Sequence, residues 1–130
     1  MSIVLNVVEM NRTSSAESFL PLKSDVLLVL LALASQPLHG YGIIREVDER
    51  SDGQVLLQTG ALYRMLRGLL RDGLIAECDQ PAESPGEDER RRYYQLTRLG
   101  EQVMDLEVER MARLVRAARM IGDGKRPRLA

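Results

Sequence analysis

The 130-residue sequence predicts a mainly α-helical (α+β) protein with three helices, a two-stranded β hairpin and one long C-terminal helix. Three observations support this class. In three segments, apolar residues recur every three or four positions, as on one face of a helix, and a fourth segment is a continuous apolar run of helical length. In two short segments they alternate with polar residues, as in strands. Gly, Pro and charged residues separate these segments, as turns require.

Composition and charge limit the class of function. The single cysteine, Cys78, excludes an internal disulfide and a cysteine-based metal cluster, and it suits a reducing cytosol. The longest apolar run, Val26–Ala34, is far shorter than the roughly 20 residues that span a bilayer. The first residues have neither the basic region nor the cleavage site of a signal peptide. We therefore expect a cytoplasmic protein without membrane contact.

The net charge of −1 does not by itself indicate a nucleic-acid partner, so its distribution matters. Residues 1–60 carry four basic and seven acidic side chains. From Ala61 to Ile75 there are three arginines against one aspartate. Basic residues are therefore concentrated in one predicted helix, and again in the C-terminal tail.

Residues 1–21 are predicted to form an N-terminal arm, either partly ordered on a partner subunit or flexible. A helix then runs from a cap at Ser24 or Asp25 to about Ser35. Its Val26–Ala34 run is apolar on every side. A helix that is apolar all round is buried all round, so we expect cover from a second subunit as well as from its own core.

A second helix is predicted to open at Gly40, with Ile43, Ile44 and Val47 facing inward, and to close at the turn of residues 51–53.

Two side chains near the start of this second helix have alternative roles. His39 is the only histidine, so a packing role in the turn is favoured over a metal or proton-transfer site. The Tyr41 hydroxyl can meet a phosphate at the helix N-terminus, or the ring can pack on the core. Both roles of Tyr41 stay open, and they are compatible.

The central stretch, Gly60–Ile75, predicts a helix with one apolar and one basic face, with Thr59 as a possible N-cap and Gly73 as its stop. Its apolar positions are Leu62, Met65, Leu66, Leu69 and Leu70, and its arginines are Arg64, Arg67 and Arg71. Such a basic face can lie in the DNA major groove, where Arg reads guanine edges or holds phosphates. A solvated surface helix has the same pattern.

After Gly73, two alternating segments predict a hairpin with a long exposed tip. Leu74, Ala76 and Cys78 share one face of the first strand, and Tyr94 and Leu96 point inward on the second. The return strand begins with three consecutive arginines: Arg90, Arg91 and Arg92.

The last helix is predicted from Arg98 to about Ile121, with Thr97 as N-cap. Its apolar residues repeat with the 4, 3, 4, 3 spacing of a coiled-coil seam: Met104, Val108, Met111, Val115 and Ala118, with Leu114 and Ile121 beside them. We expect this helix, residues 98–121, to pair with the same seam of a second copy. Residues 122–130 then form a flexible basic tail.

The order of these elements is that of a winged helix-turn-helix domain, residues 22–97, followed by a dimerisation helix. In that architecture the third helix enters the major groove and the hairpin, or wing, touches the flanking backbone. The arginines of Gly60–Ile75 and the three consecutive arginines of the wing both fall where this geometry needs them.

Three segments resemble the PadR family of bacterial transcriptional regulators, over about residues 22–104. They are LHGYGI (Leu38–Ile43), GALYRMLRGLLRDGLI (Gly60–Ile75) and RRRYYQLTRLGEQ (Arg90–Gln102). The short C-terminal region resembles the smaller subgroup, which has a single long dimerisation helix.

The resemblance implies a homodimeric repressor that binds a palindromic operator in double-stranded DNA, beside its own gene or a neighbouring detoxification or efflux gene. In some relatives a small hydrophobic effector releases the DNA. No cofactor or metal is implied. By motif match and helix position, the expected DNA-binding residues are Tyr41, Gln58, Thr59, Gly60, Tyr63, Arg64 and Arg67, with Arg90, Arg91 and Arg92 in the wing.

The alternative is a winged-helix protein-interaction adaptor without specific DNA binding. The mild net acidity and the acidic run Glu87–Glu89 beside the wing arginines favour it. An enzyme is disfavoured, because the chain lacks a phosphate-cradling glycine loop and any set of nucleophile, histidine and acid.

Overall fold

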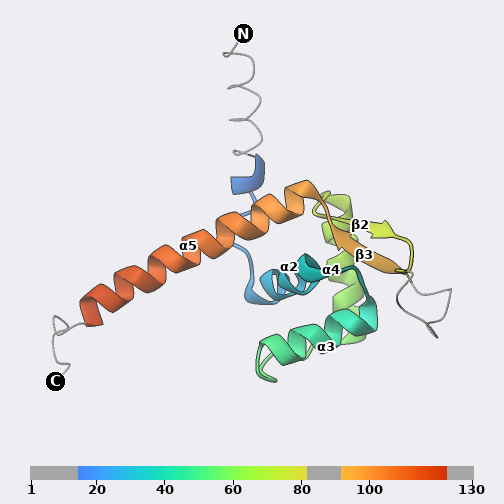
Figure 1. Ribbon diagram of the computed structural model, residues 1–130, viewed down its shortest axis with the longest axis horizontal. Helices are drawn as coiled ribbons and strands as arrows, with labels where there is room; N and C mark the ends of the chain where they lie inside the picture. The colour runs from blue at the N-terminus through green and yellow to red at the C-terminus, as the bar shows by residue number, and fades with distance from the viewer. Residues whose placement is uncertain (1–14, 82–91, 123–130) are drawn as a thin grey trace, which may run out of the picture.

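The computed structural model describes residues 15–81 and 92–122. Along the chain its elements are α2 (Ser24–Ser35), β1 (Leu38–His39), α3 (Gly40–Arg50), α4 (Thr59–Arg71), β2 (Ile75–Cys78), β3 (Tyr93–Leu96) and α5 (Arg98–Gly122) (Figure 1). The first part of the expected arm, the hairpin tip with Arg90 and Arg91, and the expected basic tail from residue 123 lie outside the described residues.

The three predicted short helices, the hairpin and the long last helix are confirmed. The sheet has a third strand that the sequence did not indicate. The strands lie in the antiparallel order β1-β3-β2, with His39 opposite Tyr93 and Ile75 opposite Leu96. At two residues, β1 is too short to show an alternating pattern. The alternation placed Ile75 on the face of β2 opposite Ala76 and Cys78, away from the core. Ile75 is nevertheless buried, because α4 also packs on β2.

The core is aliphatic and joins all four helices. Leu30 of α2, Ile43 of α3, Leu66 of α4 and Val103 of α5 are fully buried, and α2 lies between α3 and α5 (Figure 1). One side of α2 is completely enclosed, whereas its other apolar side chains, Val26, Leu28 and Leu31, are only partly buried. Burial of α2 on all sides is therefore not reached within one chain.

Part of the expected N-terminal arm belongs to this core. Ala16 is buried, and Phe19, Leu20 and Leu22 pack against the same cluster. Residues 15–22 therefore rest on their own domain.

Two expected helix caps are wrong. The N-cap residues are Lys23 for α2 and Gln58 for α4, both extended and neither making a side-chain cap bond. Ser24 and Thr59 are already the first helical residues. A cap needs an extended backbone as well as a suitable side chain, and the entry of each chain segment into the core sets that backbone.

The Thr97 cap is confirmed, and it joins α5 to the end of α4. The Thr97 hydroxyl accepts a hydrogen bond from the Gly100 amide (3.0 Å) and donates one to the Gly73 carbonyl (2.6 Å). The Thr97 amide donates to the Leu74 carbonyl (3.1 Å). A Cβ atom at residue 100 would lie only 2.0 Å from that carbonyl oxygen. The first turn of α5 thus rests directly on the backbone of the turn after α4.

A buried carboxylate ties α5 to the N-terminal segment. Glu107 is 1% exposed and accepts hydrogen bonds from the Leu22 amide (2.6 Å) and from two nitrogens of the Arg110 guanidinium. The Arg110 hydrogen bonds lower the pKa of Glu107, burial opposes them, and the Leu22 amide adds to the lowering. The ionised form is therefore the one that this site stabilises.

Gly100→Ala is expected to destabilise the fold by about 3 kcal/mol, because the added methyl group meets a backbone atom that cannot rotate away. Gly68→Ala is the matched control. Its nearest neighbour is the flexible end of Arg71 at 3.5 Å, so gained helix propensity should stabilise the protein by up to about 1 kcal/mol. Urea unfolding of both variants measures the difference, and equal effects would contradict the close contact.

Glu107→Gln is expected to flatten the loss of stability in acid. A carboxylate whose pKa is lowered by folding contributes its full stability above the unfolded pKa of about 4.3, and that contribution disappears as the pH falls through the folded pKa. Unfolding midpoints between about pH 6 and pH 3 should therefore fall more steeply for the wild type. Glu109→Gln changes an exposed glutamate two residues away and should keep the wild-type slope. Parallel curves for all three proteins would show that Glu107 is not responsible.

Candidate nucleic-acid interface

Helix α4 exposes one face, and the residues expected to read DNA lie on it. Leu62, Leu66 and Leu69 are buried, as the leucine spacing predicted. The exposed positions follow one another at helical intervals on the opposite side: Thr59, Gly60, Tyr63, Arg64, Arg67 and Arg71, preceded by the exposed N-cap Gln58.

The arginines on this face differ in their pairing. Arg71 lies 3.6 Å from the Asp72 carboxylate. Within residues 15–81 and 92–122, Arg64 and Arg67 form no ion pair with any acidic group. Two guanidinium groups on adjacent turns are thus available for an external anion or for a base edge.

The start of α3 adjoins this face through Tyr63. A Cβ atom at residue 40 would lie 2.6 Å from the Tyr63 hydroxyl oxygen and 3.1 Å from its ring carbon. The Tyr63 phenol therefore occupies the space that a Cβ atom at residue 40 would need. Glycine, which has no Cβ atom, allows this close approach. This contact, which no sequence pattern indicated, sets the α3 N-terminus beside the α4 face.

Tyr41 lies on the surface at the same place. Its side chain is 63% exposed, and the Arg45 guanidinium carbon lies 5.5 Å from the ring centroid. Packing of the Tyr41 ring in the core is therefore wrong, and the hydroxyl is open to solvent beside the helix N-terminus. The exposed Arg45 side chain belongs to this group.

His39 has the structural role that was favoured. It is the N-cap residue of α3, and its Nδ1 accepts a hydrogen bond from the Gly42 amide (3.1 Å). The ring is buried, with its edge toward Tyr93 of β3 at 5.3 Å between centroids. One residue thus fixes the start of α3 against the central strand of the sheet.

The described part of the wing contributes Arg92. Its exposed guanidinium lies 3.6 Å from Glu77 on the neighbouring strand, a surface pair that adds little energy and leaves the arginine accessible. Burial raises the pKa of Tyr94 in β3, Tyr63 and Glu77 raise it further, and Arg92 opposes them.

The distal part of α5 carries the predicted seam. Met104, its first residue, is 9% exposed and packs in the core of its own domain. From Val108 onward the seam residues are exposed, as α5 extends away from the domain (Figure 1). They are Val108, Met111, Leu114, Val115, Ala118 and Ile121. An apolar stripe of this length is left without cover within the described chain.

The sequence matches a protein-family model and a curated relative. The model of the transcriptional regulator PadR-like family matches residues 28–106, more than half of the chain. An uncharacterized 37.1 kDa protein in transposon TN4556 of Streptomyces fradiae is 38% identical over 88 residues. That match covers 68% of this chain but only 23% of the relative.

Solved structures share the fold. A PadR family transcription regulator from Clostridium difficile superposes with a TM-score of 0.63 at 24% identity, covering 76% of this chain and 98% of that one. A PadR-like transcriptional regulator from Bacillus cereus gives 0.63 at 18%, covering 76% and 91%. BpsR from Bordetella bronchiseptica gives 0.58 at 16%, covering 90% and 77%, and its DNA binding is regulated by 6-hydroxynicotinic acid. Among the described helices of the present chain, none has the length and apolar character needed to cross a membrane.

Proposed function

Because the chain belongs to the PadR-like family of transcriptional regulators, we propose that it binds double-stranded DNA sequence-specifically, as a homodimeric repressor of its own or a neighbouring detoxification or efflux gene. Its family is one of regulators rather than enzymes, in agreement with the expectation that the chain has no catalytic site.

One observation carries the DNA-binding proposal: Arg64 and Arg67 are exposed on one face of α4 without an acidic partner among the described residues. In the proposed complex this face lies in the major groove. A guanidinium can donate two parallel hydrogen bonds to guanine O6 and N7, so the two arginines supply sequence preference. Gln58 and Thr59, at the start of α4, extend the same reading face.

Other groups would hold the DNA backbone. The Tyr41 and Tyr63 hydroxyls lie beside the N-terminus of α3, where helix amides and the helix dipole favour a phosphate. Arg92 would meet the backbone that flanks the groove, and Arg90 and Arg91 precede it on the wing. These contacts supply affinity that depends on salt but not on sequence.

The exposed α5 stripe supports homodimerisation. A second copy would cover the side chains from Val108 to Ile121 with an identical stripe, and two-fold symmetry would place two α4 helices on two half-sites. The operator is then a palindrome.

Release by a small hydrophobic ligand is the regulatory part of the proposal. The neighbour BpsR, whose DNA binding is regulated by 6-hydroxynicotinic acid, supports a small-molecule ligand. The hydrophobic character of that ligand rests on the resemblance to PadR regulators.

The adaptor alternative also has an observation in its favour, because the α5 stripe would suit a different protein as well as a second copy. The discriminating measurement is fluorescence anisotropy of the full chain with the DNA upstream of its gene and with scrambled DNA, at two salt concentrations. A preference of about a hundredfold or more that weakens with salt supports the regulator. Equal weak binding to both DNAs supports the adaptor.

Arg64→Ala is expected to cost about 1–3 kcal/mol of operator binding and to relax preference at one base pair, because a bidentate contact is lost. Arg71→Ala removes the same charge at a position already paired with Asp72 and should cost less. Anisotropy with operators mutated at single positions measures both. If Arg64→Ala left affinity and preference unchanged, the reading face would be assigned wrongly.

Leu114→Lys is expected to produce a monomer that loses tight operator binding, because it places a charge within the apolar stripe at a side chain that is 57% exposed. Met120→Lys is the control, since Met120 is 74% exposed and lies on the opposite side of α5. Sedimentation equilibrium gives the mass and anisotropy the affinity. If the Leu114→Lys variant remained dimeric, the apolar stripe would not form the dimer interface.

A further inference from the structure

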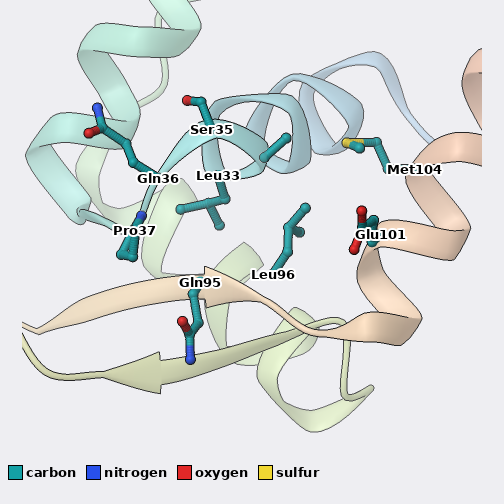
Figure 2. Close-up of a pocket in the computed structure, with 9 residues that line it drawn as sticks. Leu33, Ser35, Gln36, Pro37, Gln95, Leu96, Glu101 and Met104 are labelled. Carbon is teal, nitrogen blue, oxygen red and sulfur yellow. The ribbon is translucent and has the colours of Figure 1, made fainter.

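A groove lies where the last turn of α2, strand β3 and the first turns of α5 meet (Figure 2). Its volume is about 280 Å³, enough for a small organic molecule. The groove is separate from the exposed faces of α3 and α4. Its lining residues are Leu33, Ala34, Ser35, Gln36, Pro37, Gln95, Leu96, Glu101 and Met104.

The inner side of the groove is apolar. Figure 2 shows Leu33 of α2, Leu96 of β3 and Met104 of α5 converging from three elements. Leu33 and Met104 are almost fully buried, and Leu96 is half-buried. The Met104 thioether can adjust to the shape of a ligand, so this side suits a small apolar body.

The rim of the groove has hydrogen-bond acceptors and negative charge. Helix α2 ends here, and its last carbonyl oxygens lack intrahelical donors. In α3 and α4 a C-cap amide closes the end of the helix, from Ser51 and Asp72 respectively. For α2, no such bond occurs in the described part of the chain, and its last turn has no basic residue.

Glu101 brings a carboxylate to the same groove from α5. None of the nine lining residues is Lys, Arg or His, so no side chain of the lining neutralises it. The positive end of the α5 dipole offsets part of the Glu101 charge, because Glu101 lies in the first turn of α5. The negative end of the α2 dipole gives the other side of the groove the same sign.

We propose that this groove binds a small amphipathic organic cation, a protonated primary amine on an apolar body. The ammonium group has three N–H donors and a positive charge, and it would bind the Glu101 carboxylate while the body extends along the groove toward the end of α2. The apolar body would lie over Leu96 and the exposed edges of Leu33 and Met104. Anions of the same shape are repelled, and neutral analogues lack the charge-assisted bond.

The site touches the parts of the chain that carry the DNA-binding face. Gln36 and Pro37 lead directly into β1 and the start of α3, and β3 begins immediately after Arg92. An effect of the amine on DNA affinity rests on the proposed function, and by linkage DNA would alter amine affinity by the same factor. Binding of the amine itself requires no DNA.

The test is a methyl-detected NMR titration of the full chain, without DNA, at pH 7. Three probes share a phenylethyl body and differ in the polar group: 2-phenylethylamine, 2-phenylethanol and 3-phenylpropionate. The amine is expected to shift the methyl signals of Leu33, Leu96 and Met104 in a saturable way, at least about tenfold more tightly than either other probe. Glu101→Gln should weaken amine binding roughly tenfold, because a charge-assisted bond becomes neutral. Glu109→Gln alters an exposed glutamate outside the lining and should leave binding unchanged.

Equal affinity for the three probes, methyl shifts confined to other residues, or unchanged binding in Glu101→Gln would each overturn the proposal. The anisotropy measurement with DNA is a separate readout. Absence of DNA sequence preference would contradict the proposed function but not the proposed amine site. Failure of the NMR titration would contradict only the amine site.

Discussion

The close contact between the first turn of α5 and the backbone after α4 is the constraint on which the molecule depends. Glycine at residue 100 lets α5 approach the Leu74 carbonyl, and Thr97 bonds to both Gly73 and Gly100. Helix α4, the hairpin and the long helix all meet at this junction. Because it is made by backbone atoms and a capped helix, it fixes the direction of α5 relative to α4.

That direction matters because α5 has two different halves. The first half is part of the core, where Val103 and Met104 are buried and Glu107 bonds to the Leu22 amide. The second half leaves the domain with its apolar stripe exposed (Figure 1). In the proposed dimer, a stripe held rigidly to the domain would set the separation of two α4 helices, and so the spacing of two half-sites.

The candidate interface is built by packing between elements as much as by its own charged residues. Tyr63 lies over Gly40, and His39 caps α3 while its ring meets Tyr93 of the sheet. These contacts hold the start of α3, the exposed face of α4 and the base of the wing in one arrangement. Arg64 and Arg67 extend from a surface that these contacts hold in place. In the proposed complex with DNA, this order lowers the conformational entropy cost of binding.

The sequence by itself determined the helices, the hairpin and the two faces of α4, because periodicity and turn residues are local properties. Tertiary structure decided the rest. The two residues of β1 are a strand only because β3 lies beside them. Met104 continues the stripe in sequence but is buried by its own domain, and Glu107 is a buried carboxylate because residue 22 lies against it. Burial depends on which elements that are distant in sequence pack together. The periodicity of apolar residues along one helix does not specify those partners.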